Sequence, residues 1–136
     1  DELFLDLFGL DSAEALRNCG GKDIFLTILL TFCESIPETA DALEAFAGAE
    51  DWKNYTILVH SLKSSARLIG AVTLSEAARE LEQFGKLAQE GNGEAVAQLR
   101  QRTAGFLQET RSSVARLAPL CNAAAMKQAG GGQAGR

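Results

Sequence analysis

Proline and strand-forming residues are scarce in this 136-residue chain. The only prolines are Pro37 and Pro119, which leaves long stretches without a residue that breaks helices. Valine, isoleucine and threonine are few and scattered, so continuous strands lack the residues that favour them. Alanine, leucine, glutamate, glutamine and arginine, which favour helices, are abundant instead. The composition therefore predicts an all-α protein.

The sequence also lacks a long apolar run and an excess of basic residues. The longest apolar stretch, residues 24–33, is interrupted by Thr27 and Thr31 and is shorter than the roughly 18 residues that a membrane-spanning helix needs. We therefore predict no membrane contact by this segment. The net charge of −5 at pH 7 argues against nucleic acid as a partner, because nucleic acid requires a basic face.

The three cysteines are odd in number and lack the spacing of metal ligands. We interpret Cys19, Cys33 and Cys121 as reduced thiols, which indicates a cytoplasmic protein. Because the chain begins at Asp1 without an initiator methionine, we also expect it to be a piece of a longer protein.

Capping residues and apolar spacing predict five helices. Asp11 and Gly20 bound a short first helix, and Asp51 and Gly70 bound the helix that holds the only histidine. Pro37 is expected to kink the second helix without dividing it. The predicted helices span residues 12–18, 22–47, 52–69, 73–89 and 94–117.

Long helices with short connections must pack antiparallel to their neighbours. We predict an up-down-up-down four-helix bundle over residues 11–118, with the short first helix capping one end. Residues 1–10 are apolar and acidic, and are expected either to cover an end of the bundle or to be a linker remnant. Residues 119–136 are rich in glycine and small side chains, which predicts a disordered tail, with a helical extension over 123–129 as the alternative.

The single histidine, His60, lies on a polar and basic face of its predicted helix. Apolar side chains point to the opposite side of that helix and can enter a core. His60 is therefore expected to meet solvent or a partner protein. At about 100° per residue, the side chains within about 60° of it are those of Lys53, Thr56, Lys63, Ser64 and Arg67.

Spacing alone leaves three interpretations of His60. It can be an exposed histidine without a role. A metal or haem ligand is disfavoured, because the chain has no second histidine and Ile57 stands where a paired carboxylate would be needed, so we predict no metal site. In the third interpretation the imidazole accepts a chemical group at a nitrogen. Lys63 would then supply a nearby cation, and the small Ser64 would leave the approach open.

The run HSLKSSARLIGA, residues 60–71, resembles the signature of histidine-containing phosphotransfer (HPt) domains, H-x-L-K-G-S-[SA]-x-x-x-G-A. Ser64 departs from that signature, which usually has glycine at this place. The predicted helices upstream and the downstream run LSEAARELEQFGK also resemble the family. The resemblance implies a helical bundle whose histidine carries a phosphoryl group.

The resemblance implies a phosphorelay intermediate without a kinase or ATP site. HPt domains accept a phosphoryl group from the aspartate of one receiver domain and pass it to another. His60 would be the phosphoryl acceptor, and Lys63 would stabilise the phosphoryl oxygens. No cofactor of its own is expected, and Mg²⁺ would come with the partner receiver domain.

The protein is expected to act as a monomer. The missing methionine and the glycine-rich end favour a module of a hybrid sensor kinase, at the cytoplasmic end of a membrane-anchored protein, over a free-standing domain. The alternative function is a passive helical adaptor that docks receiver domains without phosphotransfer.

Two residues on the next helix are candidates to orient the imidazole. Counted from the turn at Gly70, the rise per residue places Glu82 or Gln83 at the height of His60 on the neighbouring helix. An acceptor for the Nδ1–H group would leave Nε2 free as the nucleophile. The predicted docking face for a receiver comprises Lys53, Thr56, Ser64, Arg67 and Lys86.

Overall fold

Helices make up the secondary structure of the described residues. The computed structural model describes residues 8–134, and side chains as far as residue 127; no strand occurs in this part of the chain. The prediction of an all-α fold is confirmed. The helices are α2 (Ser12–Cys19), α3 (Lys22–Gly48), α4 (Trp52–Leu68), α5 (Val72–Gln89) and α6 (Gly93–Ala134).

The predicted capping residues stand at the helix ends. The side chain of Asp11 accepts a hydrogen bond from the Glu14 backbone N–H at 3.0 Å and begins α2. Asp51 accepts from the Asn54 N–H at 3.2 Å and begins α4. Each carboxylate satisfies a backbone donor that has no partner within its helix. Gly20 ends α2 in the left-handed conformation.

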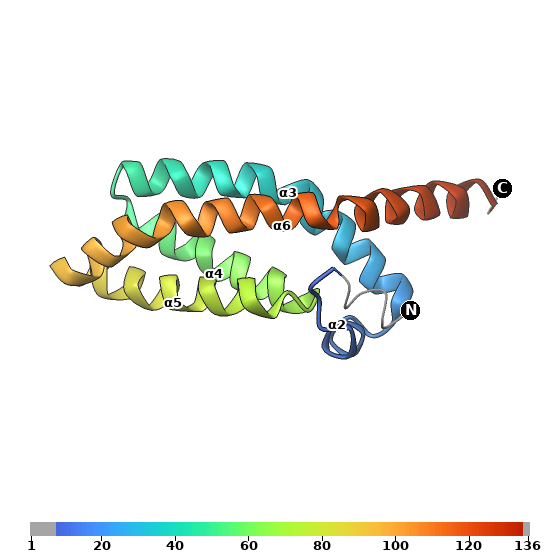
Figure 1. Ribbon diagram of the computed structural model, residues 1–136, viewed down its shortest axis with the longest axis horizontal. Coiled ribbons are helices and arrows are strands. Elements are labelled where there is room, and N and C mark those ends of the chain that lie inside the picture. The colour runs from blue at the N-terminus through green and yellow to red at the C-terminus, as the bar shows by residue number, and fades with distance from the viewer. Residues whose placement is uncertain (1–7, 135–136) are drawn as a thin grey trace.

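The four long helices pack in a ring, in which each contacts two others. The contacting pairs are α3 with α4, α4 with α5, α5 with α6, and α6 with α3. Figure 1 shows that successive helices run in opposite directions. The short α2 lies at one end against α3 and α4. The predicted up-down-up-down bundle with a capping helix is therefore confirmed.

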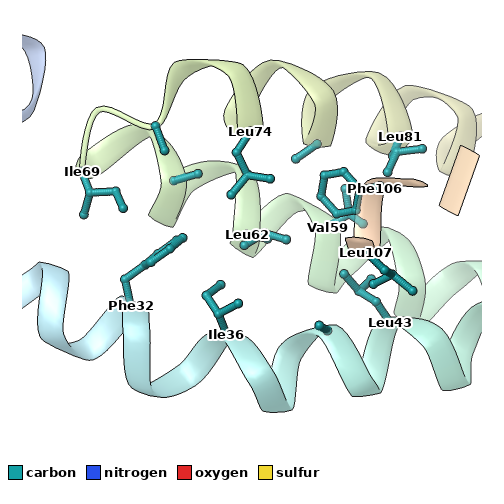
Figure 2. Close-up of a cluster of buried hydrophobic side chains, with 14 of the residues drawn as sticks. Phe32, Ile36, Leu43, Val59, Leu62, Ile69, Leu74, Leu81, Phe106 and Leu107 are labelled. Carbon is teal, nitrogen blue, oxygen red and sulfur yellow. The ribbon is translucent and has the colours of Figure 1, made fainter. Parts of the chain in front are cut away.

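The core consists of apolar side chains from all four long helices. Phe32 and Ile36 of α3 face Leu62 of α4, and further along the bundle Val59 lies near Leu81 and the α6 residues Phe106 and Leu107 (Figure 2). One buried polar link crosses this core, because the Tyr55 hydroxyl lies 2.8 Å from the hydroxyl of Thr103 on α6. Burial of the ring thus leaves no phenolic group without a partner.

Pro37 lies inside α3 and does not divide it, as predicted. A proline has no N–H to donate, so the carbonyl of Cys33, one turn before Pro37, lacks its usual hydrogen-bond donor. Figure 1 shows that α3 changes direction between its N-terminal part and its longer C-terminal part. The bend lets the N-terminal part lie beyond the end of α5.

The prediction of a disordered tail from residue 119 is wrong for the described residues. Helix α6 continues through Pro119 to Ala134, and Leu120, Cys121 and Ala124 are buried. Lys127 reaches Asp23 near the start of α3, with 3.3 Å between Nζ and Oδ1. As far as residue 127, the extension packs on α3, where Cys121 lies against Cys33 and Lys127 against Asp23.

The interpretation of all three cysteines as reduced thiols is also wrong for two of them. The structure joins Cys33 of α3 to Cys121 of α6 in a disulfide, with the Cα atoms 6.4 Å apart. The two are separated by 88 residues in the sequence, and only the packing of α6 on α3 brings them together. Cys19 is free and buried.

Residues 8–11, directly before α2, pack on one end of the bundle. Residues 1–7 lie outside the described residues, but Leu10 is buried and the Asp11 N–H donates to the Gly70 carbonyl at 2.8 Å. Gly70 has a φ of +78°, and a Cβ atom there would lie 2.5 Å from the Asp11 carbonyl oxygen. The turn between α4 and α5 therefore needs glycine both for its conformation and for this contact.

Gly70→Ala should destabilise the fold more than a glycine substitution in a comparable turn. We expect a loss of about 2–4 kcal/mol, because left-handed strain and the collision with Asp11 both act. Gly91→Ala is the matched control: φ there is +89°, and nothing lies near the added Cβ, so only the strain of about 1–2 kcal/mol remains. Urea unfolding of both variants measures the difference. Equal losses would show that the contact with Asp11 does not restrict this turn.

Candidate functional site

His60 lies in the middle of α4, on the side that borders α5. Its side chain is 58% exposed, as the sequence predicted for a residue on the polar face. The ring is nevertheless held from one side: its Nδ1 atom lies 2.6 Å from Oε2 of Glu82 on α5. An exposed ring that is anchored through one nitrogen can present the other to a reactant.

Glu82 is the buried centre of this site. Its side chain is only 7% exposed, yet three basic groups surround its carboxylate. Oε1 accepts a hydrogen bond from Lys63 Nζ at 2.6 Å, and Oε2 lies 3.6 Å from Lys86 Nζ as well as bonding His60. Burying a carboxylate is costly unless it is paired and hydrogen-bonded, and these partners meet that requirement.

The hydrogen bond to Glu82 determines the tautomer of a neutral His60. An ionised carboxylate can only accept hydrogen bonds, so Nδ1 must carry the proton. Nε2 then has a lone pair and is the ring nitrogen that Glu82 does not contact. The arrangement is thus able to bind an electrophile at Nε2 without first losing a proton from that atom.

The carboxyl group of Glu82 is held in its ionised form. Burial alone would raise its pKa, but hydrogen bonds from Lys63 and His60, together with their charges, outweigh burial and lower the pKa of Glu82 below 4.5. The group is therefore an acceptor over the whole physiological pH range. This is the condition under which it can keep the Nδ1 proton in place.

Of the two residues predicted to orient His60, only Glu82 does so in the structure. Gln83 is exposed, whereas the buried Glu82 directs its side chain toward the imidazole. The calculation from helix rise gave the correct height but left two neighbours open. The direction of the side chain around α5 distinguishes them.

The prediction that Thr56 belongs to the docking face is wrong. Thr56 is only 6% exposed, and its hydroxyl donates to the Trp52 carbonyl at 2.6 Å. The helical angle placed it correctly within about 60° of His60, but on the side that faces α5. Packing against α5 buries this side of α4 and exposes the other.

Most of the predicted docking face is exposed. Lys53, Ser64 and Arg67 of α4 and Lys86 of α5 all lie at the surface. Sequence reasoning missed Ile57, whose side chain is 60% exposed one turn before His60. An exposed isoleucine so close to the imidazole was visible in the sequence as an apolar residue on a polar face. The surface around His60 is therefore both basic and partly apolar.

A family model described as Hpt domain matches residues 27–113, well over half of the chain. This chain belongs to the Hpt domain family. Hpt domains are phosphocarrier modules that act in histidine phosphotransfer within phosphorelays, interact with receiver domains and are not kinases. No curated protein and no solved structure matches the chain significantly. The matched residues of this Hpt domain include His60, Lys63 and Glu82.

Among the described residues, no group of three or more histidine, cysteine, aspartate or glutamate side chains is arranged to hold a metal ion. None of the described helices combines the length and apolar character that crossing a bilayer requires.

Glu82→Gln should change how the stability of the fold depends on pH. The lowered pKa of Glu82 stabilises the folded state above pH 4.5, and this contribution disappears as the pH falls through the folded-state value. The difference in unfolding free energy between the parent and the variant should therefore shrink as the pH falls from above 4.5 through the folded-state pKa of Glu82. Urea unfolding across this range measures it. The control is Glu76→Gln, which removes an exposed carboxylate on the same helix. If the difference in unfolding free energy were equally independent of pH for both variants, Glu82 would not be the stabilised carboxylate.

Proposed function

We propose that this Hpt domain accepts a phosphoryl group on Nε2 of His60 from the aspartate of one receiver domain and passes it to the aspartate of another. The observation that carries the proposal is the 2.6 Å contact between Nδ1 and the buried Glu82, beneath a ring that is 58% exposed. This contact leaves Nε2 as the nucleophile on the accessible side. The matched family supports the reaction class.

The transfer step needs little from the protein beyond position and charge. The Nε2 lone pair attacks phosphorus as the bond from phosphorus to the aspartyl oxygen breaks, which regenerates the aspartate carboxylate. The ring becomes positively charged as the nitrogen–phosphorus bond forms, and Glu82 stabilises that charge through the Nδ1–H group. Return of the phosphoryl group to a second aspartate reverses the same bonds.

Lys63 and Lys86 supply positive charge beside the transferring group. Both ammonium groups contact Glu82, so two positive charges stand against one carboxylate at this site. The remaining positive charge favours the approach of a phosphoryl group, whose transition state spreads negative charge over three oxygens. Mg²⁺ belongs to the receiver in this proposal, as the carboxyl phosphate does.

The surface around His60 is the proposed docking face for the receiver. Lys53, Arg67 and Lys86 attract an acidic partner, although this steering weakens with salt because exposed charges are screened over about 8 Å at physiological ionic strength. Ile57, 60% exposed, offers an apolar contact at the same place. The domain acts as a monomer and meets each receiver transiently.

His60→Gln should abolish acceptance of phosphate while leaving the fold intact. The glutamine amide can still donate to Glu82, so the loss of unfolding free energy should stay within about 1 kcal/mol. The measurement is acid-labile, base-stable phosphate on the protein after incubation with a phosphorylated receiver domain. Phosphate retained on the variant would place the acceptor elsewhere. A parent protein that binds the receiver but never carries phosphate would instead favour a passive adaptor.

Ser64→Gln should slow transfer by blocking the docking face. Ser64 is exposed one turn after His60, and its hydroxyl donates only to the His60 carbonyl at 3.3 Å. A longer side chain there would stand between the receiver and Nε2 without disturbing the core. Ser64→Gly is the matched control and should transfer at least as fast as the parent. Rates from a phosphorylated receiver, with helical circular dichroism for each variant, test this. An unchanged rate for Ser64→Gln would mean that the receiver docks on a different surface.

A further inference from the structure

Gly85 of α5 lies directly against Thr56 of α4, close to the site. Gly85 is buried in the interior of α5, where glycine costs about 0.5–1 kcal/mol relative to alanine. A Cβ atom at this position would lie 2.1 Å from the Thr56 hydroxyl oxygen and 3.1 Å from its Cβ atom. Glycine is therefore required here by the nearness of α4.

Thr56 fits this contact in one orientation. Its hydroxyl donates to the Trp52 carbonyl at 2.6 Å. This hydrogen bond fixes the side chain along the helix, so the hydroxyl needs no hydrogen-bond acceptor on α5. The two residues thus form a contact of small groups, threonine on α4 and glycine on α5. Their sizes determine how near the two helices can lie at this level.

The contact stands one turn along the helix pair from His60 and Glu82. Thr56 precedes His60 by four residues on α4, and Gly85 follows Glu82 by three residues on α5. Because α4 and α5 run antiparallel (Figure 1), the Thr56–Gly85 pair and the His60–Glu82 pair lie at neighbouring levels of the same two helices. A change in helix separation at one pair is transmitted directly to the other.

We propose that Thr56 and Gly85 are positioning residues for phosphotransfer: their close contact sets the distance between α4 and α5 at which Glu82 reaches Nδ1 of His60. This inference rests on the proposed function for its effect on rate, but not for its effect on the imidazole. The distance between Nδ1 and Oε2 is 2.6 Å, the short distance of a charge-assisted hydrogen bond, so a larger distance between the helices lengthens this bond. Wider separation therefore weakens the bond that keeps the proton on Nδ1.

The experiment measures which ring nitrogen of His60 carries the proton. His60 is the only histidine in the chain, so its two ring nitrogens give unambiguous ¹⁵N signals in the unphosphorylated protein. The parent should show the proton on Nδ1. Gly85→Ala should lower the Nδ1–H fraction and slow acceptance of phosphate by about tenfold to a hundredfold, the range that a misplacement near 1 Å produces.

Rescue separates positioning from a general packing defect. In the double variant Thr56→Ala with Gly85→Ala, the two Cβ atoms would lie about 3.1 Å apart, a tight contact that a small shift relieves. The Nδ1–H fraction and the rate should return toward those of the parent. Gly105→Ala, at an open position on α6, is the control and should change neither. If Gly85→Ala does not fold, Thr56→Ile adds bulk from the other helix and should cause the same loss.

Each result decides the proposal. An unchanged tautomer and rate in a folded Gly85→Ala or Thr56→Ile protein would overturn it, and so would a double variant that folds without recovering the Nδ1–H signal. If the tautomer follows this pattern but no variant, including the parent, accepts phosphate, the positioning role stands and the proposed function fails. The two failures are therefore distinguishable.

Discussion

The buried carboxylate of Glu82 is the constraint on which the site depends. Its side chain is 7% exposed, and such a group is stable only when its charge is compensated. The compensation comes from His60 and Lys63 on α4 and from Lys86 on α5. The charge therefore ties the two helices together in one register. The exposed imidazole is placed by a group that solvent hardly reaches.

Sequence reasoning located this site because its components follow from local geometry. Residues counted from the turn at Gly70, together with the rise of a helix, predicted that either Glu82 or Gln83 lies at the height of His60. The same reasoning failed for Thr56, because an angle around α4 does not tell which flank meets α5. Burial of Thr56 and exposure of Ile57 are two results of that single unknown.

The errors at the C-terminal end have a different physical cause. Leu120, Cys121 and Ala124 recur at helical spacing, but Pro119 and the glycines that follow argued for a tail. This segment packs on a surface far away in sequence, which includes Asp23 and Cys33 of α3. The same packing pairs Cys33 with Cys121, which no spacing rule connects. Contacts between residues so distant in sequence are not encoded in any local pattern.

The cluster around Glu82 also explains how a small bundle can serve phosphotransfer with few groups. Lys63 is 27% exposed and bound to Glu82, so in the proposed transfer its ammonium is in place before the phosphoryl group arrives. An ammonium fixed in advance contributes charge without the cost of reorganising at the moment of reaction. Glu82 thus has two effects. It keeps the proton on Nδ1 of His60, and it holds the ammonium of Lys63, which follows His60 by one turn of α4. Loss of its charge would remove both effects together, which makes it the least replaceable side chain beneath the imidazole.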